Sequence, residues 1–175
     1  MNEIAFTPVT EADLPLLRRW LGAPHWQAWW NDDAEVEMGY WCDMLAGRDT
    51  TRPFLFHLGG EPMGYIQYWL VRDARVEPWL TETPWVNWLP DDTIGVDISV
   101  GPMDALSKGI GSQALAAFVS WLRAEGHNQI IIDPDPANGR AIRAYQKAGF
   151  RPITEFEGRT GNCLLMRHHK ESETA

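Results

Sequence analysis

A glycine-containing loop between an apolar strand pattern and a long amphipathic helix pattern is the feature that most limits how this chain folds. The strand pattern covers Thr93 to Val100, and the helix pattern covers Gly109 to Glu125. One face of the helix pattern is apolar, and Gly126 follows as a stop signal. A short, continuous apolar run from Gln129 to Ile132 is typical of a buried strand. A strand, a long helix and a buried strand in succession favour a mixed α/β sheet.

The rest of the chain predicts further strands and helices around this unit. The other strands are expected at Ile4–Val9, Pro53–Leu58, Met63–Leu70, Phe150–Phe156 and Asn162–Arg167, and the other helices from Thr10 and over Ala34–Ala46 and Asn138–Ala148. Thr10 and Asp13 form a capping-box pattern, and Gly59-Gly60-Glu61-Pro62 is a hairpin signal. Arg72 to Asp92, with three prolines, is expected to be a long loop.

The resulting order is β-α-α-β-β-β-α-β-α-β-β, with helices on both faces of a mixed sheet. There are too few parallel βα units for a full doubly wound fold. We expect one domain over residues 1–170 and a frayed polar tail over residues 171–175.

Composition and charge exclude several functional classes. The net charge of −9 argues against nucleic acid as a partner, because phosphate binding requires a basic face. No apolar run approaches the roughly 20 residues that a membrane span needs, and the N-terminus has no signal-peptide pattern. Two distant cysteines, Cys42 and Cys163, give neither a disulfide framework nor a metal-ligand spacing. We therefore expect a cytoplasmic protein without a metal site and without a membrane partner.

Two segments carry acidic residues without any basic residue, and these segments also contain most of the tryptophans. Lys and Arg are absent from Trp20–Gly47 and from Val76–Leu106, while the chain has ten Trp in all. Acidic loops that keep the protein in solution would give this pattern. A cleft that attracts a cation would give it too, because carboxylates and aromatic faces both bind ammonium groups. Composition alone leaves both interpretations open.

The loop before the long helix has the residues of an anion site. It contains two glycines at the start of the helix and consists of Ser107, Lys108, Gly109, Ile110, Gly111 and Ser112. Glycines let backbone N–H groups approach an anion closely, and the helix N-terminus adds its positive dipole end. The loop lacks the Gly-Lys-Ser/Thr ending of a Walker loop and the acidic partner of a dinucleotide fingerprint. A pyrophosphate site and a simple tight turn are both compatible with the pattern.

A second motif, from Asn138 to Phe150, makes the chain resemble the GNAT superfamily of acyltransferases. The glycine loop is similar to the family's pyrophosphate motif, and the Asn…Ala…Tyr-x-x-x-Gly-Phe run is similar to its second coenzyme A motif. Leu106 departs from the Arg or Gln that the family often has there. The resemblance implies acetyl-coenzyme A as co-substrate. The co-substrate would contact three sets of residues: the strand end Ile98, Ser99 and Val100, the loop Ser107–Ser112, and Asn138, Ala141 and Tyr145.

Closer similarity is visible to the aminoglycoside 6′-N-acetyltransferases. The matching pieces are His25–Trp30, Gly60–Gln67, Gly95–Asp97, Asp133–Asn138 and Tyr145–Phe150. This resemblance implies acetylation of a polycationic aminoglycoside, with the 6′ amine as the site of attack. Siderophore-pathway acyltransferases share some of these pieces, so a siderophore precursor, a polyamine or another small amine is the alternative substrate. A non-catalytic coenzyme A-binding sensor is the alternative outside enzymes. The protein could be a monomer or a homodimer.

The resemblance also implies roles for single residues. Asp97 would orient the amine and accept its proton, and Tyr145 would donate a proton to the leaving thiolate. Backbone N–H groups near Ile98–Val100 would polarise the thioester carbonyl. Asp133 would hold a second amine. Each of the three side chains also has a structural alternative. Asp97 could cap N–H groups at the strand end, Tyr145 could be a core tyrosine, and Asp133 could be a turn residue before Pro134.

The predicted substrate wall consists of Trp29, Trp30, Glu77, Trp79 and Glu82. His25 and His57 lack a partner in the sequence pattern, so they are assigned no catalytic role.

Overall fold

The computed structural model describes residues 3–30 and 33–169, and its contacts divide the chain into two compact units. The first unit consists of Met1–Tyr68 and Asp97–Ala114, and the second consists of Trp69–Val96 and Leu115–Ala175. We describe each unit by itself. The single domain over residues 1–170 stays a prediction, and the predicted tail at 171–175 lies outside the described residues.

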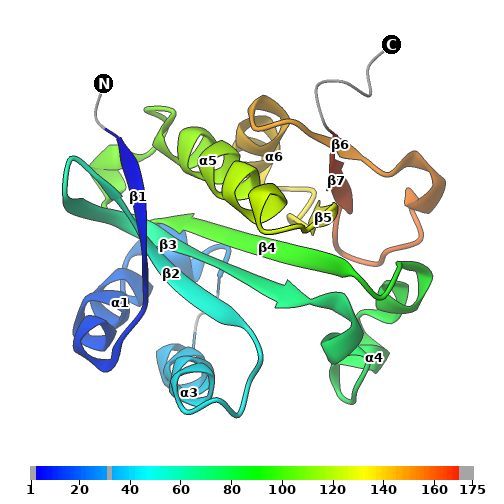
Figure 1. Cartoon of the computed structure of the whole chain (residues 1–175), viewed down its shortest axis with the longest axis horizontal. Coiled ribbons are helices and arrows are strands. Elements are labelled where there is room, and N and C mark those ends of the chain that lie inside the picture. Colours follow the sequence, from blue (N-terminus) through cyan, green and yellow to red (C-terminus); the bar gives the residue numbers. More distant parts are fainter. Residues whose placement is uncertain (1–2, 31–32, 170–175) are drawn as a thin grey trace. The chain divides into compact units, whose positions relative to one another are not determined.

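The strands of the first unit follow one another in space as they do in sequence, as Figure 1 shows. β1 (Ile4–Pro8) pairs antiparallel with β2 (Arg52–Leu58), which pairs antiparallel with β3 (Glu61–Leu70). The second half of β4 (Thr93–Val100) continues this order, and the Gly101 N–H donates to the Met63 carbonyl at 2.8 Å just beyond it. The hairpin predicted between β2 and β3 is confirmed, with Gly59 and Gly60 as its turn.

Two helices cover one side of β1–β3 in the first unit (Figure 1). A short 3-10 turn, η1 (Glu11–Asp13), leads into α1 (Leu14–Leu21), and α3 (Ala34–Leu45) follows the one-turn helix α2 (Pro24–Gln27). The predicted capping box is confirmed: the Asp13 carboxylate accepts from the Thr10 backbone N–H and from its hydroxyl, both at 2.8 Å. The core that these helices share with the strands is rich in aromatic residues and includes Leu17, Trp20, Leu21, Trp26, Trp41, Leu55 and Tyr65.

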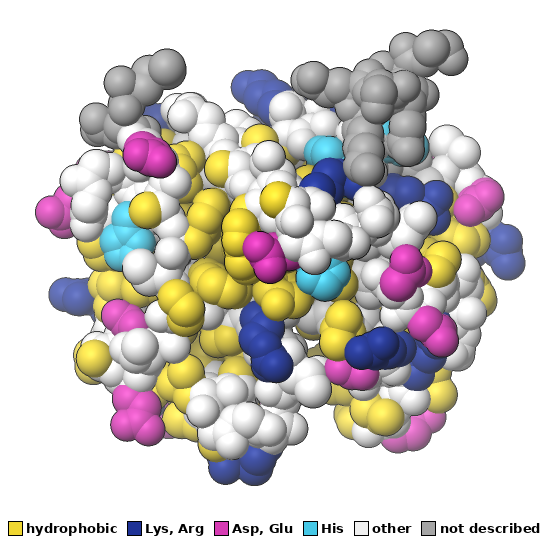
Figure 2. Space-filling view, in the orientation of Figure 1, with side chains coloured by type: hydrophobic (Ala, Val, Ile, Leu, Met, Phe, Trp, Pro, Cys, Tyr) yellow, Lys and Arg dark blue, Asp and Glu magenta, His cyan; other side chains and the backbone are white. Residues whose placement is uncertain are grey.

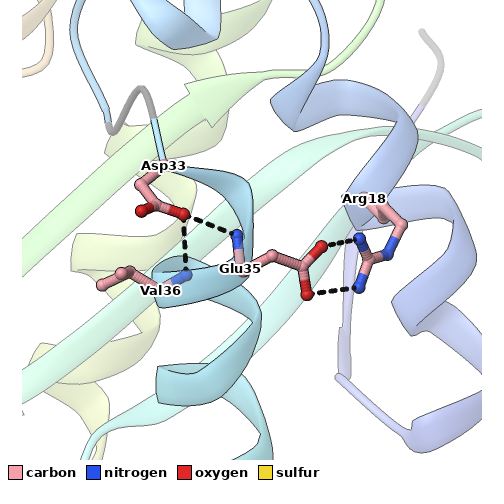
Figure 3. A network of polar contacts seen from close by, with 4 residues as sticks. All are labelled: Arg18, Asp33, Glu35 and Val36. Atoms are coloured by element: carbon pink, nitrogen blue, oxygen red, sulfur yellow. Dashed lines mark hydrogen bonds and ion pairs between the residues drawn. The ribbon is translucent and has the colours of Figure 1, made fainter.

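Polar contacts at the start of α3 cap that helix and join it to α1 (Figure 3). The Asp33 carboxylate accepts from the backbone N–H groups of Glu35 and Val36 at 3.0 and 3.2 Å, which satisfies two of the amides that a helix N-terminus leaves without a partner. Both guanidinium nitrogens of Arg18 contact the Glu35 carboxylate. This hydrogen-bonded pair lowers the pKa of Glu35 and raises that of Arg18. Because both side chains are exposed, the pair contributes little stability.

The second unit contains the parallel strand pair. The first half of β4 pairs in parallel with β5 (Gln129–Ile132), which pairs antiparallel with β7 (Met166–His168), and β7 pairs antiparallel with β6 (Phe150–Pro152). α5 (Ile110–Ala124) crosses from the first unit into the second, and α6 (Gly139–Lys147) precedes β6. The predicted mixed α/β fold, with a mostly antiparallel open sheet flanked by helices, is confirmed.

The segment predicted as a long loop is a series of short helical turns. They are η2 (Val71–Ala74), α4 (Trp79–Glu82) and η3 (Pro84–Trp88). Arg75 holds the segment together: its guanidinium contacts the Asp91 carboxylate at 2.5 Å and donates to the carbonyls of Leu89 and Val86 at 2.7 and 3.2 Å. The turns bury Val71, Trp85, Val86 and Leu89 in a core with Ile131, Ile153 and Leu165.

One position in β4 has room for glycine alone. A Cβ added at Gly95 would lie 2.2 Å from the Trp69 indole, a separation that packed atoms do not tolerate. The Trp69 ring in turn packs against Trp85, with 6.5 Å between the ring centroids. The absent side chain therefore lets the indole lie against the strand.

The strands predicted at the C-terminal end are wrong in length. β6 ends at Pro152, and the 3-10 turn η5 (Thr154–Phe156) replaces the rest of the predicted strand. β7 begins at Met166 rather than at Asn162. Local bonds explain the shortening, because the Thr160 hydroxyl donates to the Cys163 carbonyl at 2.7 Å and holds a turn where the strand was expected.

On the face shown in Figure 2, Lys and Arg side chains are interspersed with Asp and Glu side chains. Within residues 3–30 and 33–169, no helix has the length and apolar character needed to cross a bilayer.

Candidate active site

The loop before α5 has the backbone of an anion site. Ser107 and Gly109 both have positive φ angles, 61° and 81°, and α5 begins directly after them at Ile110. A left-handed residue in a turn points neighbouring N–H groups toward one spot, and the first amides of a helix have no acceptor within it. A non-glycine residue such as Ser107 has a higher backbone energy at positive φ. Residues with strained backbone of this kind are concentrated at functional sites. A loop with this backbone can present N–H groups to an anion.

Close packing fixes the start of α5 against the end of β4. A Cβ added at Gly111 would lie 3.3 Å from Cγ2 of Val100, so a larger residue would push the helix away from the strand. The Ser112 hydroxyl donates to the Gly109 carbonyl at 2.9 Å and closes the loop. The predicted cofactor residues of the first unit, Ile98–Val100 and Ser107–Ser112, thus lie at one strand end and the adjoining helix start.

The Val100 carbonyl ties this strand end to the segment before the tryptophan pair. It lies 2.9 Å from both the Trp26 indole nitrogen and Nε2 of His25. His25 is therefore in contact with the backbone at the end of β4. Trp26 is fully buried.

Asp97 lies at the point where β4 enters the first unit, and it is half-buried. The Gln67 side-chain amide donates to the Asp97 carboxylate at 2.8 Å, and the Tyr65 hydroxyl donates to the Gln67 amide oxygen at 2.5 Å. Tyr65 is fully buried, and burial raises its pKa well above the usual range. The carboxylate predicted to bind the amine is thus held by two residues that the sequence analysis assigned no role.

Trp30 packs on the same tyrosine. The Trp30 and Tyr65 rings meet edge to face, with 5.3 Å between their centroids, and Trp26 lies 5.4 Å from Trp30. Trp29 is 44% exposed, so it can still contact a ligand. The first unit therefore brings Trp30 and Asp97 to the two ends of one chain of contacts through Tyr65 and Gln67.

Asp133 lies in the second unit, directly after β5. The next residue, Pro134, accepts a hydrogen bond from the Leu164 N–H at 2.8 Å, which places the Asp133 loop beside the segment that leads to β7. Burial, with the nearby Asp133 charge as a smaller cause, raises the pKa of the Cys163 thiol to about 11. The carboxylate is half-buried at the carboxyl end of β5, where open α/β sheets bind ligands.

α6 carries Tyr145, and Asn138 caps its N-terminus. The predicted N-cap is confirmed, because the Asn138 amide oxygen accepts from the Ala141 N–H at 3.1 Å. Tyr145 is half-buried, and it lies seven residues later, nearly two helical turns along the same face.

The predicted wall residues Glu77, Trp79 and Glu82 gather at the short helix α4. The Glu77 carboxylate accepts from the Thr81 N–H at 3.2 Å and from its hydroxyl at 2.7 Å, so it holds the turn together. Trp79 is 43% exposed, and Glu82 is exposed at the end of the turn. Their roles toward a substrate stay predictions.

Gln67 and Tyr65 are the site residues that the sequence analysis missed. Both lie on β3, on the same face of the strand because side chains alternate. The available signal was a polar pair two positions apart in an otherwise apolar strand. Among the residues that the structure describes, no group of three or more His, Cys, Asp or Glu side chains is arranged to hold a metal ion.

Comparisons with known proteins agree on one family. A family model described as acetyltransferase (GNAT) domain matches residues 9–158. The aminoglycoside N(6′)-acetyltransferase type 1 of Klebsiella pneumoniae is 35% identical over 157 residues, which cover 85% of this chain and 74% of that protein. A kanamycin resistance protein of Rhizobium radiobacter is 42% identical over 57 residues, 32% of this chain and 53% of that protein.

The solved structure of AAC(6′)-Ib in complex with paromomycin and acetyl-coenzyme A has a TM-score of 0.80 and 26% identity, covering 98% of this chain and 96% of that one. The complex of the same enzyme with coenzyme A and kanamycin has a TM-score of 0.79 at the same identity, covering 97% of this chain and 96% of that one.

Proposed function

Because the chain belongs to the acetyltransferase (GNAT) domain family, we propose that it transfers the acetyl group of acetyl-coenzyme A to a primary amine of an aminoglycoside, at the 6′ position. The observation that carries the proposal is the 35% identity to an aminoglycoside N(6′)-acetyltransferase over 85% of the chain. We place the reaction in the cytoplasm, with a small polycation as substrate.

The backbone at the start of α5 supports acetyl-coenzyme A as co-substrate. The positive φ angles of Ser107 and Gly109 and the helix N-terminus suit a pyrophosphate, which is the most strongly charged part of this molecule apart from its 3′-phosphate. The N–H groups of Ile98–Val100 would polarise the thioester carbonyl. Asn138, Ala141 and Tyr145 complete the assigned coenzyme A site.

Asp97 is assigned to the amine. Attack on the thioester requires a neutral amine, whereas the amines of a polycation are mostly protonated near pH 7. A carboxylate attracts the ammonium group and accepts its proton, directly or through water. The hydrogen bond from Gln67 holds the Asp97 carboxylate in one orientation for this purpose.

Tyr145 is assigned as proton donor to the leaving group. The amine nitrogen forms a bond to the carbonyl carbon, the carbon–sulfur bond breaks, and the departing thiolate takes a proton from the tyrosine hydroxyl. The nitrogen of the new amide gives up its second proton, which returns through water to the tyrosine oxygen. Asp133 would bind a second ammonium group of the same substrate. Trp29, Trp30, Glu77, Trp79 and Glu82 would form the wall against its sugar rings, because sugar faces stack on indoles and ammonium groups pair with carboxylates.

The test is free thiol release from acetyl-coenzyme A, with kanamycin, tobramycin and a 6′-hydroxyl aminoglycoside offered in parallel with lysine and spermidine. We expect turnover only with the compounds that carry a 6′ amine. Turnover only on lysine or spermidine would mean that the substrate is a small amine and not an aminoglycoside. The assignment to the GNAT family would be unaffected. Binding of kanamycin without any turnover would favour a coenzyme A-dependent sensor.

A further inference from the structure

The Asp97 carboxylate belongs to a continuous chain of hydrogen bonds that reaches into the core of the first unit. The chain runs from the Tyr65 hydroxyl to the Gln67 amide oxygen at 2.5 Å, and from the Gln67 amide nitrogen to Oδ2 of Asp97 at 2.8 Å. Gln67 and Asp97 are half-buried, and Tyr65 is fully buried. Thirty residues separate Gln67 from Asp97, so strand pairing and not local sequence brings them together.

The direction of this chain is set by Asp97, because a carboxylate only accepts and therefore requires the Gln67 amide nitrogen to face it. The Gln67 amide oxygen then faces the Tyr65 hydroxyl, which donates to it. Burial above all, with the charges of Glu37, Asp97 and Asp49, raises the pKa of Tyr65, so the hydroxyl keeps the proton that it donates. A flipped amide would place its oxygen against the carboxylate and lose the bond to Asp97.

The Tyr65 ring is fully buried among aromatic side chains. Trp30, Trp41 and Trp26 surround the ring, with centroid separations of 5.3, 5.3 and 6.5 Å. The hydroxyl also lies 3.9 Å from the sulfur of Met44 on α3. The carboxylates that act on this tyrosine come from three elements: Glu37 on α3, Asp49 in the loop after α3, and Asp97 on β4.

We propose that Tyr65 and Gln67 are positioning residues that hold the Asp97 carboxylate in the orientation in which it accepts the substrate ammonium group. The inference rests on the proposed function, because it deepens the role assigned to Asp97. A carboxylate on a strand can rotate about two side-chain bonds, and a fixed donor on one oxygen removes most of that freedom. Orientation of this kind acts on the rate of the reaction, since small misplacements of a reacting group lower turnover strongly.

The first arm of the test compares three variants. Gln67→Met removes both hydrogen bonds at nearly constant volume, and Tyr65→Phe removes only the hydroxyl. We expect about a 10- to 100-fold lower kcat for Gln67→Met and about a 3- to 10-fold lower kcat for Tyr65→Phe, with acetyl-coenzyme A affinity unchanged. Tyr68→Phe, one position further on the same strand, is the matched control and should leave turnover unchanged. Gln67→Asn replaces Gln67→Met if that variant fails to fold, because its shorter amide cannot span both partners.

The second arm is a double-mutant cycle with Asp97→Asn. If Gln67 acts through Asp97, Gln67→Met should cost less than about twofold in the Asp97→Asn background. An equal loss in both backgrounds would overturn the proposal, because Gln67 would then act independently of Asp97.

The third arm needs no turnover. A fully buried tyrosine hydroxyl that donates a hydrogen bond should exchange its proton slowly with water, so that NMR can follow its signal. This signal should move in Gln67→Met and also in Asp97→Asn, since a hydrogen-bonded chain polarises along its length. A Tyr65 signal unmoved by Asp97→Asn would overturn the inference even in an active enzyme. If the enzyme is inactive on every aminoglycoside but the Tyr65 signal moves in both variants, the proposed function is wrong. The hydrogen-bonded chain that holds Asp97 is then still supported.

Discussion

The indole N–H of Trp26 donates to the backbone carbonyl of Val100 at 2.9 Å. This bond joins the segment just before Trp29 and Trp30 to the last residue of β4. The Trp26 ring itself is fully buried between Trp20 and Trp30, with centroid separations of 5.9 and 5.4 Å. One side chain therefore ties the predicted substrate wall of the first unit to the strand end assigned to acetyl-coenzyme A.

Trp26→Phe should lower the free energy of unfolding by about 1–3 kcal/mol. The change removes one hydrogen bond to a buried carbonyl and leaves a cavity where the larger ring was. Trp29→Phe, at a largely exposed ring, is the matched comparison and should change stability by less than about 0.5 kcal/mol. Urea denaturation of the three proteins measures the difference. Equal stability of both variants would mean that the Val100 bond contributes nothing.

Asp97→Asn should lower turnover on aminoglycosides by about 10²- to 10⁴-fold, because an amide cannot accept the ammonium proton. The affinity for acetyl-coenzyme A should stay the same, and equilibrium binding of the cofactor checks it. Asp135→Asn, in the loop where Asp135 accepts from the Ala137 N–H at 2.7 Å, is the control and should retain turnover. Near-normal turnover of Asp97→Asn would remove this residue from the mechanism.

Tyr145→Phe should lose about 10²- to 10⁴-fold in turnover while the fold is kept, because the leaving thiolate loses its proton donor. Rates at saturating concentrations of both substrates measure the effect. Tyr40→Phe on α3 is a matched loss of one hydroxyl at an exposed position. If Tyr145→Phe and the wild type have the same saturating rate, the acid role is wrong.

Gly109→Ala should weaken acetyl-coenzyme A binding about tenfold. Its φ of 81° is unfavourable for alanine, so the loop should relax and misplace the N–H groups assigned to the pyrophosphate. Gly158→Ala is the matched control, since Gly158 also has a positive φ of 71° and lies in an exposed turn. Both variants should lose about 1 kcal/mol of stability, and calorimetric titration should find lost affinity in Gly109→Ala alone. If both variants lose affinity for acetyl-coenzyme A, the cause is a general loss of structure and not a change in the loop before α5.

Cys163 should resist alkylation at pH 8, whereas Cys42 should react. The Cys163 pKa of about 11 leaves on the order of one thiol in a thousand ionised at that pH, and Cys42 is exposed. The thiolate fraction grows as pH rises toward 11, so labelling of Cys163 should increase about tenfold per pH unit. Mass spectrometry after iodoacetamide treatment measures both sites. Because the Asp133 charge contributes to the raised pKa, Asp133→Asn should modestly speed the labelling of Cys163, and an unchanged rate would contradict that contact.

The two central strands could be predicted to the residue. Thr93–Val100 and Gln129–Ile132 are both observed as predicted, because glycine or proline signals follow each of them closely. The N-cap at Asn138 and the capping box at Thr10 were equally accessible, since each depends on residues within three positions. Local chemistry was sufficient wherever the partner was close in sequence.

The helical turns between Val71 and Trp88 could not be predicted in the same way. Arg75 stabilises them through Asp91 and through the carbonyls of Leu89 and Val86, and nothing local identifies these partners. Ser107 is a similar case, since its positive φ is uncommon for serine and has no signal in its neighbours. The hydrogen bond between Gln67 and Asp97 depends on the packing of separate strands, so the sequence pattern could supply the carboxylate but not its support.

The contact between Gly95 and the Trp69 indole has a consequence for how relatives of this enzyme diverge. Any single replacement of Gly95 displaces the indole, and any loss of the indole leaves a void above the strand, so each change alone should destabilise the protein. The two positions should therefore covary across homologues, with glycine at 95 wherever a large aromatic residue occupies 69. Trp79, by contrast, is 43% exposed, so a single substitution there should cost the fold less.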